Sequence, residues 1–173
     1  MHARSSASST GHTLGHYVQG AAVPGQSGRF GTVFDPASGE PRLQVTFANH
    51  SETGQAVSAA AAAAPAWAAT PALQRARVLF RFKELIEQHR DELAELITAE
   101  HGKVLADARG EVTRGLEVVE FACGIPHLLK GEFSENVGSG VDSWSLRQPV
   151  GVCVGITPFN FPAMVPLWMF PIA

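Results

Sequence analysis

Two long stretches in the middle of the chain carry hydrophobic residues at every third or fourth position. In the first stretch the repeating positions are Leu79, Phe82, Ile86, Leu93 and Ile97, and in the second they are Leu105, Ala108, Val112, Leu116, Val119 and Cys123. This spacing places each set on one face of a helix. We therefore predict one helix that begins at Thr70-Pro71 and stops at His101-Gly102, and another from about Lys103 to Pro126.

Shorter runs with a two-residue period come before these helices. Residues 43–47 alternate between hydrophobic and polar and predict a strand, and residues 31–34 form a similar run. Between them, residues 35–40 hold Pro and Gly where a tight turn needs them. An alanine-rich helix is expected next, capped by Ser51 and ended by Pro65. The first part of the chain is therefore predicted to be a small sheet followed by a helix.

The last part of the chain changes character again. Residues 137–150 mix polar and hydrophobic positions, which predicts an exposed strand or hairpin arm. Residues 151–156 are small or β-branched and uncharged, as in a buried parallel strand. A loop with Pro158 and Pro162 follows, and residues 163–173 resemble the opening turns of a buried helix. These elements predict an α/β fold, with a sequence that stops just after an active-site edge.

Composition narrows the class of protein. The 173 residues suffice for one domain with a core, and a net charge of -3 argues against nucleic-acid binding. Residues 151–173 are the most apolar run, but their four prolines argue against a membrane span. Cys123 and Cys153 lack metal-type spacing, so both are interpreted as buried, and no metal site is expected.

The first 15 residues are rich in Ser and His and contain no apolar core. We interpret residues 1–15 as a disordered tail, with a targeting segment as the alternative, because no acidic residue precedes Asp35. His2, His12 and His16 have no partners at ligand spacing and are interpreted as tail residues.

Asn160 is the strongest candidate for a chemical role. It follows the predicted strand and lies between two prolines, flanked by Phe159 and Phe161. An amide held by a stiff loop can donate to an oxyanion, and one such donor lowers a barrier by about 3 kcal/mol. The alternative is an asparagine that only satisfies backbone groups of its own loop.

The loop ITPFNFP and the helix WAATPALQRARVLFRFKELIEQHRDELAELITAEHGK resemble the aldehyde dehydrogenase superfamily. The resemblance covers about residues 16–173. It implies that Asn160 donates to the oxyanion of the thiohemiacetal. It also implies that Ile156, Thr157, Pro158 and Phe159 line the site of the cofactor, NAD.

Three segments narrow the resemblance to one branch: GRFGTVFDPASGE, EVTRGLEVVEFACGIPHLLKGE and PFNFPAMVPLWMFPIA. They resemble the methylmalonate-semialdehyde dehydrogenases, which acylate coenzyme A. Such substrates carry a carboxylate, and the resemblance implies that Arg114 binds it, since arginine can do so through two hydrogen bonds. The alternative is a solvated surface on which Glu111, Arg114 and Glu117 pair at a spacing of three.

The resemblance also implies a domain organisation. Residues 16–136 would be the N-terminal part of an NAD-binding domain, residues 137–150 an oligomerisation strand, and residues 151–173 the start of the dinucleotide-binding core. The family's catalytic cysteine, general-base glutamate and glycine-rich pyrophosphate turn find no counterpart here. Without a thiolate nucleophile, the 173-residue polypeptide alone is expected to be inactive.

The function implied for the parent enzyme is oxidation of methylmalonate or malonate semialdehyde with NAD. Coenzyme A would be the co-substrate, carbon dioxide would be lost, and the reaction would serve valine breakdown, with inositol breakdown as a second route. A cytoplasmic homo-oligomer without membrane or nucleic-acid partners is expected. One alternative is a hydrolytic aldehyde dehydrogenase that releases a free acid. The other is a non-catalytic truncated subunit that binds full-length protein.

Overall fold

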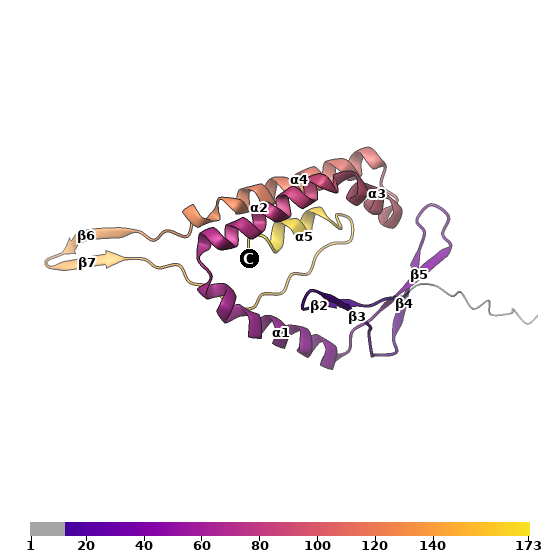
Figure 1. Ribbon diagram of the computed structural model, residues 1–173, viewed down its shortest axis with the longest axis horizontal. Helices are drawn as coiled ribbons and strands as arrows, with labels where there is room; N and C mark the ends of the chain where they lie inside the picture. Colours follow the sequence, from indigo (N-terminus) through magenta and orange to yellow (C-terminus); the bar gives the residue numbers. More distant parts are fainter. Residues whose placement is uncertain (1–12) are drawn as a thin grey trace, which may run out of the picture. The chain divides into compact units, whose positions relative to one another are not determined.

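The computed structural model describes residues 13–173 (Figure 1). It forms two compact units, one ending at Ala60 and the other comprising Ala61–Ala173. Helix α1, His50–Ala69, contains the boundary between them. The domain limits expected from the sequence refer to a larger protein and stay predictions.

The first unit is built from short strands. They are β1 (Thr13–Leu14), β2 (His16–Val18), β3 (Ala21–Val23), β4 (Phe30–Phe34) and β5 (Pro41–Thr46). Strands β1, β5 and β4 form a sheet in that order, with β1 parallel and β4 antiparallel to β5, while β2 and β3 form a hairpin. The two predicted strands are confirmed. So is the turn between them, in which Asp35 Oδ1 accepts a hydrogen bond from the Ala37 amide at 2.8 Å.

Two corrections concern the start of the chain. Thr13 and Leu14, within the predicted tail, pair with Gln44 and Val45, so backbone hydrogen bonds order the chain before His16. His16 itself is a member of β2, and its Nε2 lies 3.5 Å from Glu52 Oε1, so it is not a tail residue. The rest of the predicted tail, including His2 and His12, lies outside the described residues.

Helix α1 begins and ends at residues other than those predicted. Its N-cap is Asn49, whose Oδ1 accepts from the Glu52 amide at 2.9 Å while Glu52 Oε2 accepts from the Asn49 amide at 2.8 Å. This reciprocal pair is a capping box, which Ser51 is badly placed to form because it already lies in the helix. Pro65 lies inside α1 rather than ending it. Thr70 is not the next N-cap, because its Oγ1 donates backwards to Ala66 O at 2.9 Å.

The predicted helix from Thr70 to His101 is two helices, α2 (Ala72–Gln88) and α3 (Arg90–His101), which meet at His89. The expected stop is confirmed, because Gly102 adopts the left-handed conformation with φ of 80° and closes α3. Helix α4 (Leu105–Cys123) follows, and a short 3-10 turn, η1 (Ile125–His127), contains Pro126. No single described helix is long and apolar enough to cross a membrane; α1 and α2 would qualify only as a sharply bent pair.

The core of the second unit lies between α2, α3, α4 and a short helix, α5 (Met164–Met169). Its buried members are Ile86, Ala94, Ile97, Ala108, Val112, Val119 and Leu167. Five of the eleven helical positions predicted from the spacing are among them, and Phe82, Leu93, Leu105 and Leu116 pack around them. Leu167 lies against Gly115, where a Cβ atom would come within 2.5 Å of Leu167 Cδ1. The absent side chain of Gly115 therefore allows α5 to pack closely on α4.

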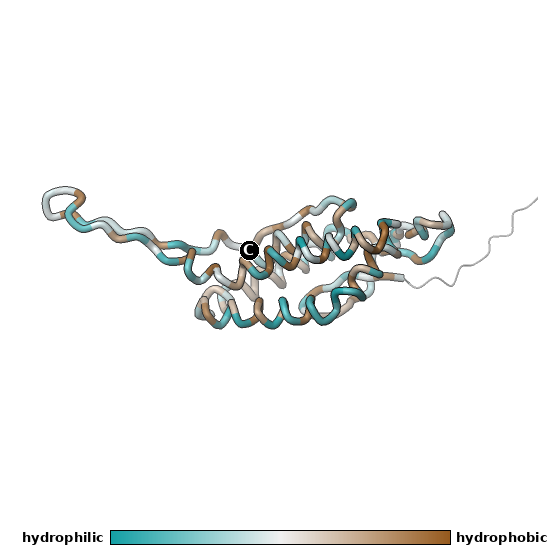
Figure 2. Tube along the Cα trace, turned by 90° about the horizontal axis from the view of Figure 1, so that it is seen from above, coloured by the Kyte–Doolittle hydropathy of each residue, from teal (hydrophilic) through white to brown (hydrophobic). Residues whose placement is uncertain are grey.

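The hairpin arm predicted near residues 137–150 is confirmed as β6 (Phe133–Gly138) and β7 (Val141–Trp144), which pair antiparallel. It begins earlier than predicted, and every residue in both strands is exposed. Figure 1 shows the hairpin extending away from α2 and α4. Figure 2 shows hydrophobic and hydrophilic positions interspersed along the helices, as the amphipathic patterns predict.

The buried strand predicted at residues 151–156 is wrong. These residues form no strand and are exposed, and Gly151 has φ of 102°. The physical reason is that a strand needs neighbouring strands for its backbone hydrogen bonds, and none of the described strands pairs with this segment. Its apolar side chains consequently remain uncovered.

Candidate functional site

An open pocket of about 500 Å³ lies beside the first half of α4. The loop before α5 supplies Asn160 and Phe161, and the end of α3 with the start of α4 supplies Lys103, Glu111 and Arg114. Asn160 and Arg114, the two residues for which the sequence predicted contact with the reacting molecule, therefore line the same pocket. Segments far apart in the sequence meet here because α5 packs against α4.

The Asn160 loop is tied to the helices through its backbone. The carbonyl oxygen of Asn160 accepts a hydrogen bond from Lys103 Nζ at 3.1 Å. The same ammonium lies over the ring of Phe161, 4.4 Å from its centroid, which is a cation–π contact. The Asn160 residue is exposed beside the pocket. Its amide can therefore serve a bound molecule, as the oxyanion hypothesis requires.

Glu111 is the buried charge of the site, with only 3% of its surface exposed. Its Oε1 accepts hydrogen bonds from the backbone amides of Ala163 at 2.8 Å and Met164 at 3.1 Å, and its Oε2 pairs with Lys103 Nζ at 2.5 Å. Burial raises the pKa of Glu111, but the Lys103 ammonium and the two amides outweigh it. The net result is a pKa below the ordinary value for a glutamate. Glu111 is therefore a fully paired carboxylate.

Sequence reasoning missed Lys103 and misplaced Glu111. Glu111 was considered only as a surface partner of Arg114, yet it is buried and pairs with Lys103. The spacing along the helix predicts that Glu111 is buried, because it lies three residues after Ala108 and four before Gly115, both of which are buried. A charged residue at a buried helical position needs a partner, and that requirement pointed to a nearby cation.

Arg114 stands at the surface of α4 beside the pocket. Its backbone carbonyl accepts a hydrogen bond from Trp168 Nε1 at 3.2 Å, which ties α5 to α4. Within residues 13–173, its guanidinium takes part in no ion pair, although Arg81 and Arg109 do pair with carboxylates. The guanidinium is thus available for an anion in the pocket.

The four residues predicted to line the cofactor occupy the extended segment before the loop. Ile156 and Phe159 are 89% and 90% exposed, and the segment does not line the pocket. Among the described residues, no backbone–backbone hydrogen bond of the loops and turns involves residues 156–159. The segment therefore offers an apolar surface and free backbone groups, which suits one face of a flat, polar-edged ring such as a nicotinamide.

The two cysteines differ. Cys123 is buried, as predicted, and burial raises the pKa of its thiol. Cys153 is exposed, contrary to the prediction, because the segment around it has no covering strand. No cluster of three or more metal-ligating side chains occurs in the described part of the chain.

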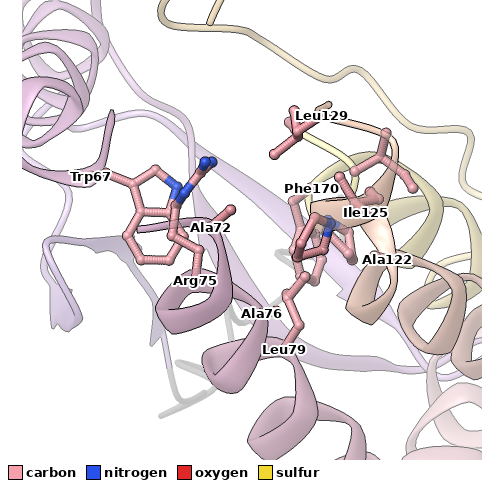
Figure 3. A pocket seen from close by; sticks show the side chains of 13 residues that line it. Trp67, Ala72, Arg75, Ala76, Leu79, Ala122, Ile125, Leu129 and Phe170 are labelled. Atoms are coloured by element: carbon pink, nitrogen blue, oxygen red, sulfur yellow. The ribbon is translucent and has the colours of Figure 1, made fainter. Parts of the chain in front are cut away.

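A second pocket of about 100 Å³ lies between the start of α2 and the end of α4 (Figure 3). Its lining includes the apolar side chains of Trp67, Leu79, Ile125, Leu129 and Phe170, and Arg75 is the one charged side chain among the residues that line it. It lacks converging polar groups, so it is a weaker candidate for chemistry than the pocket at Asn160.

Comparison with known proteins shows which family the sequence and the fold resemble. Residues 23–173 match the aldehyde dehydrogenase family. The chain is 53% identical to the malonate-semialdehyde dehydrogenase of Pseudomonas aeruginosa over 161 residues, which are 93% of this chain and 32% of that protein.

Solved structures that resemble this fold include dehydrogenases of the same kind. The methylmalonate-semialdehyde dehydrogenase of Oceanimonas doudoroffii matches with a TM-score of 0.89 and 58% identity over 92% of this chain and 33% of its own. A structure described as the corresponding enzyme of Sinorhizobium meliloti 1021, complexed with NAD, gives a TM-score of 0.90 and 50% identity, covering 94% of this chain and 33% of that one. The chain thus spans about a third of the length of the relatives that it matches.

Proposed function

Because the chain belongs to the aldehyde dehydrogenase family, we propose that it is part of a semialdehyde dehydrogenase that acylates coenzyme A. The whole protein converts methylmalonate or malonate semialdehyde, NAD⁺ and coenzyme A to propionyl- or acetyl-coenzyme A, carbon dioxide and NADH. The names of the relatives support the substrate class. The observation that carries the proposal is the presence of Asn160 and Arg114 in one pocket.

The two residues have complementary roles in this proposal. Arg114 binds the carboxylate of the semialdehyde through charged hydrogen bonds and so directs its aldehyde end toward Asn160. The amide of Asn160 donates to the aldehyde oxygen as that oxygen becomes negative during attack by a thiolate from outside this chain. Neither role requires a change in the fold described above.

The NAD site is assigned in part to residues 156–159. Their uncovered backbone groups and apolar side chains support contact with the nicotinamide face, next to the loop that carries Asn160. NAD, when bound, accepts the hydride that leaves the aldehyde carbon. These residues exclude water from one face of the ring and hold it beside the substrate.

Coenzyme A and decarboxylation complete the proposal. The thiol of coenzyme A attacks the carbonyl of the enzyme thioester and takes over the acyl group, the enzyme thiolate leaves, and the carboxylate carbon is lost as carbon dioxide. One carbon–carbon bond breaks and a proton takes its place. The pathway proposed for this reaction is valine breakdown, and inositol breakdown is a second route that yields a semialdehyde of this class.

Two further features belong to the proposal. We assign the β6–β7 hairpin to an interface between subunits of a homo-oligomer, a role supported by its exposed Phe133 and Trp144.

The bacterial origin of similar proteins supports a cytoplasmic location, whereas the relative from Arabidopsis thaliana is mitochondrial.

The substrate role is tested with Arg114→Ala in the whole protein. We expect kcat/KM for methylmalonate semialdehyde to fall at least about 100-fold, since charged hydrogen bonds contribute about 1.5–3 kcal/mol each. Propanal, which has no carboxylate, loses little. Arg109→Ala is the matched control, because Arg109 lies on the same helix but pairs with Asp91 at 2.8 Å. Equal losses on both aldehydes would show that Arg114 does not recognise the carboxylate.

The acylating step is tested separately. Turnover of the whole protein is measured with and without coenzyme A, and the product is identified by mass spectrometry. The proposal expects an acyl-coenzyme A and dependence on the thiol. A free carboxylic acid formed equally fast without coenzyme A would identify a hydrolytic dehydrogenase instead.

A further inference from the structure

We propose that Lys103 and Glu111 are positioning residues, which together form a bridge that fixes the loop carrying Asn160 and so aims its amide at the reacting oxygen. This inference rests on the proposed function, because it assigns the bridge a catalytic consequence. The bridge itself is a matter of geometry, and it can be measured without turnover.

The bridge holds the loop at four points within five residues. Lys103 Nζ contacts the Asn160 carbonyl at 3.1 Å and the Phe161 ring at 4.4 Å. Glu111 Oε1 accepts from the Ala163 and Met164 amides at 2.8 and 3.1 Å. The two halves are joined by the pair between Glu111 Oε2 and Lys103 Nζ. The backbone from Asn160 to Met164 is therefore anchored to the same two side chains.

The loop has little other support. Within the described residues, no backbone hydrogen bond joins residues 152–162 to the rest of the chain. Helix α5 has no side-chain cap of its own on the residue before it. Glu111, which lies on α4, caps α5 in its place by accepting from the Ala163 and Met164 amides. A negative charge is favourable there because the N-terminus of a helix carries free amides and a partial positive charge. Loss of the bridge would leave Asn160 attached only through α5 and the extended segment before it.

The chemistry of the bridge requires an ionised carboxylate. Both Glu111 oxygens act as acceptors, one for two amides and the other for an ammonium. A glutamine of the same shape has one carbonyl oxygen and one NH₂ group. Its NH₂ group would face either the backbone amides or the Lys103 ammonium, which are donors too, so that contact would be lost. Glu111→Gln therefore breaks one half of the bridge without creating a cavity.

The catalytic consequence follows from the way that oxyanion donors work. A donor stabilises a transition state only if it already points at the atom that gains charge. A displacement of about 1 Å can reduce a rate about 100-fold. Because the bridge holds the backbone from Asn160 to Met164, its loss should lower kcat while substrate binding at Arg114 persists.

The test uses Glu111→Gln and Lys103→Met in the whole protein. We expect kcat to fall about 10- to 100-fold with KM changed less than about threefold. The amides of Ala163 and Met164 should exchange with solvent faster than in the unchanged protein. Lys103→Arg should restore part of the rate, since it keeps the charge. The matched controls are Lys83→Met and Glu87→Gln, which break a surface pair of 2.7 Å away from the pocket and should change neither readout.

A double variant separates positioning from general stability. If Glu111 acts through Asn160, adding Glu111→Gln to Asn160→Ala should cause little further loss of kcat, because the donor is already absent. Additive losses would overturn the inference, as would unchanged protection of the Ala163 and Met164 amides in Glu111→Gln. If the unchanged protein oxidises no semialdehyde, the proposed function fails. The exchange measurements would still confirm or contradict the bridge.

Discussion

The helices of the second unit and the segment from Val150 to Phe159 contain similar hydrophobic residues, but those on the helices include buried ones and those in the segment are exposed. Val112 on α4 is fully buried, whereas Val150 is 92% exposed. Ile86 on α2 is buried, whereas Ile156 is exposed. The difference cannot come from residue type, because the same side chains occur in both regions.

The difference comes from the way each region satisfies its backbone. A helix forms its hydrogen bonds within itself, so an amphipathic sequence can fold and then bury its stripe against other helices. An extended segment obtains such bonds only from a neighbouring strand, and none of the described strands lies beside residues 150–159. Hydrophobicity therefore indicates which residues should be covered, but not whether a partner is present.

The largest expected effect comes from placing the same charge in both regions. Val112→Asp puts an unpaired carboxylate into the core and should lower the free energy of unfolding by more than about 4 kcal/mol. Val150→Asp should change it by less than about 0.5 kcal/mol, because the site is solvated. Urea unfolding followed by circular dichroism measures both. A large loss in Val150→Asp would show that the extended segment is packed in solution.

The two cysteines test the same contrast without any substitution. Cys123 is buried and its pKa is raised by burial, whereas Cys153 is exposed. Iodoacetamide should therefore modify Cys153 at least about tenfold faster at neutral pH, since the thiolate is the nucleophile and must be reachable. Peptide mass spectrometry gives the two rates. Equal rates under native conditions, with equal rates in urea as reference, would contradict the difference in burial.

Two glycines of α4 test how closely α5 packs against α4. Gly115→Ala would place a Cβ 2.5 Å from Leu167 Cδ1 and 3.1 Å from Leu167 Cβ. Overpacking costs about 1–3 kcal/mol and alanine returns about 1 kcal/mol of helix propensity, so a net loss near 1 kcal/mol is expected. Gly110→Ala meets open space and should gain about 0.5–1 kcal/mol. Thermal unfolding compares them; a stabilising Gly115→Ala would mean that α5 does not pack on α4 as described.

The smallest effect is confined to acid pH. The pKa of Glu111 in the folded chain lies below its ordinary value near 4.5, so its ionised form contributes stability above that value. The contribution is lost as the pH falls through the folded pKa. The stability gap between the unchanged chain and Glu111→Gln should therefore be constant near neutrality and shrink below about pH 4.5. Tryptophan fluorescence follows it, because all three tryptophans lie in the second unit. A gap that widens in acid would contradict the assignment.

Local patterns predicted much of the fold. The helical stripes of α2 to α4, the turn at Asp35 and the stop at Gly102 depend on residues close in sequence, and all three are confirmed. Two of the errors concern choices between nearby alternatives. Asn49 rather than Ser51 caps α1, and the predicted long helix breaks at His89. In each case several residues suit the local structure, and Asn49 caps α1 because its side chain and that of Glu52 each accept from the backbone amide of the other.

The candidate site shows the same division. Asn160 and Arg114 were identified from their motifs, and the structure adds that they share a pocket. Glu111 and Lys103 were not identified as partners, although they lie eight residues apart. The loop that both of them contact is distant in sequence, at separations of 57 and 52 residues.

The local sequence is enough to predict which residues form helices, where the tight turns lie and which loop carries the amide, because these depend on interactions over a few residues. Only the tertiary structure decided that Glu111 is a buried, paired carboxylate and that α5 rests on Gly115. It also decided that the apolar run at residues 151–156 stays uncovered. Burial and ion pairing depend on which distant segments meet, and the spacing of residues along one segment does not specify its neighbour.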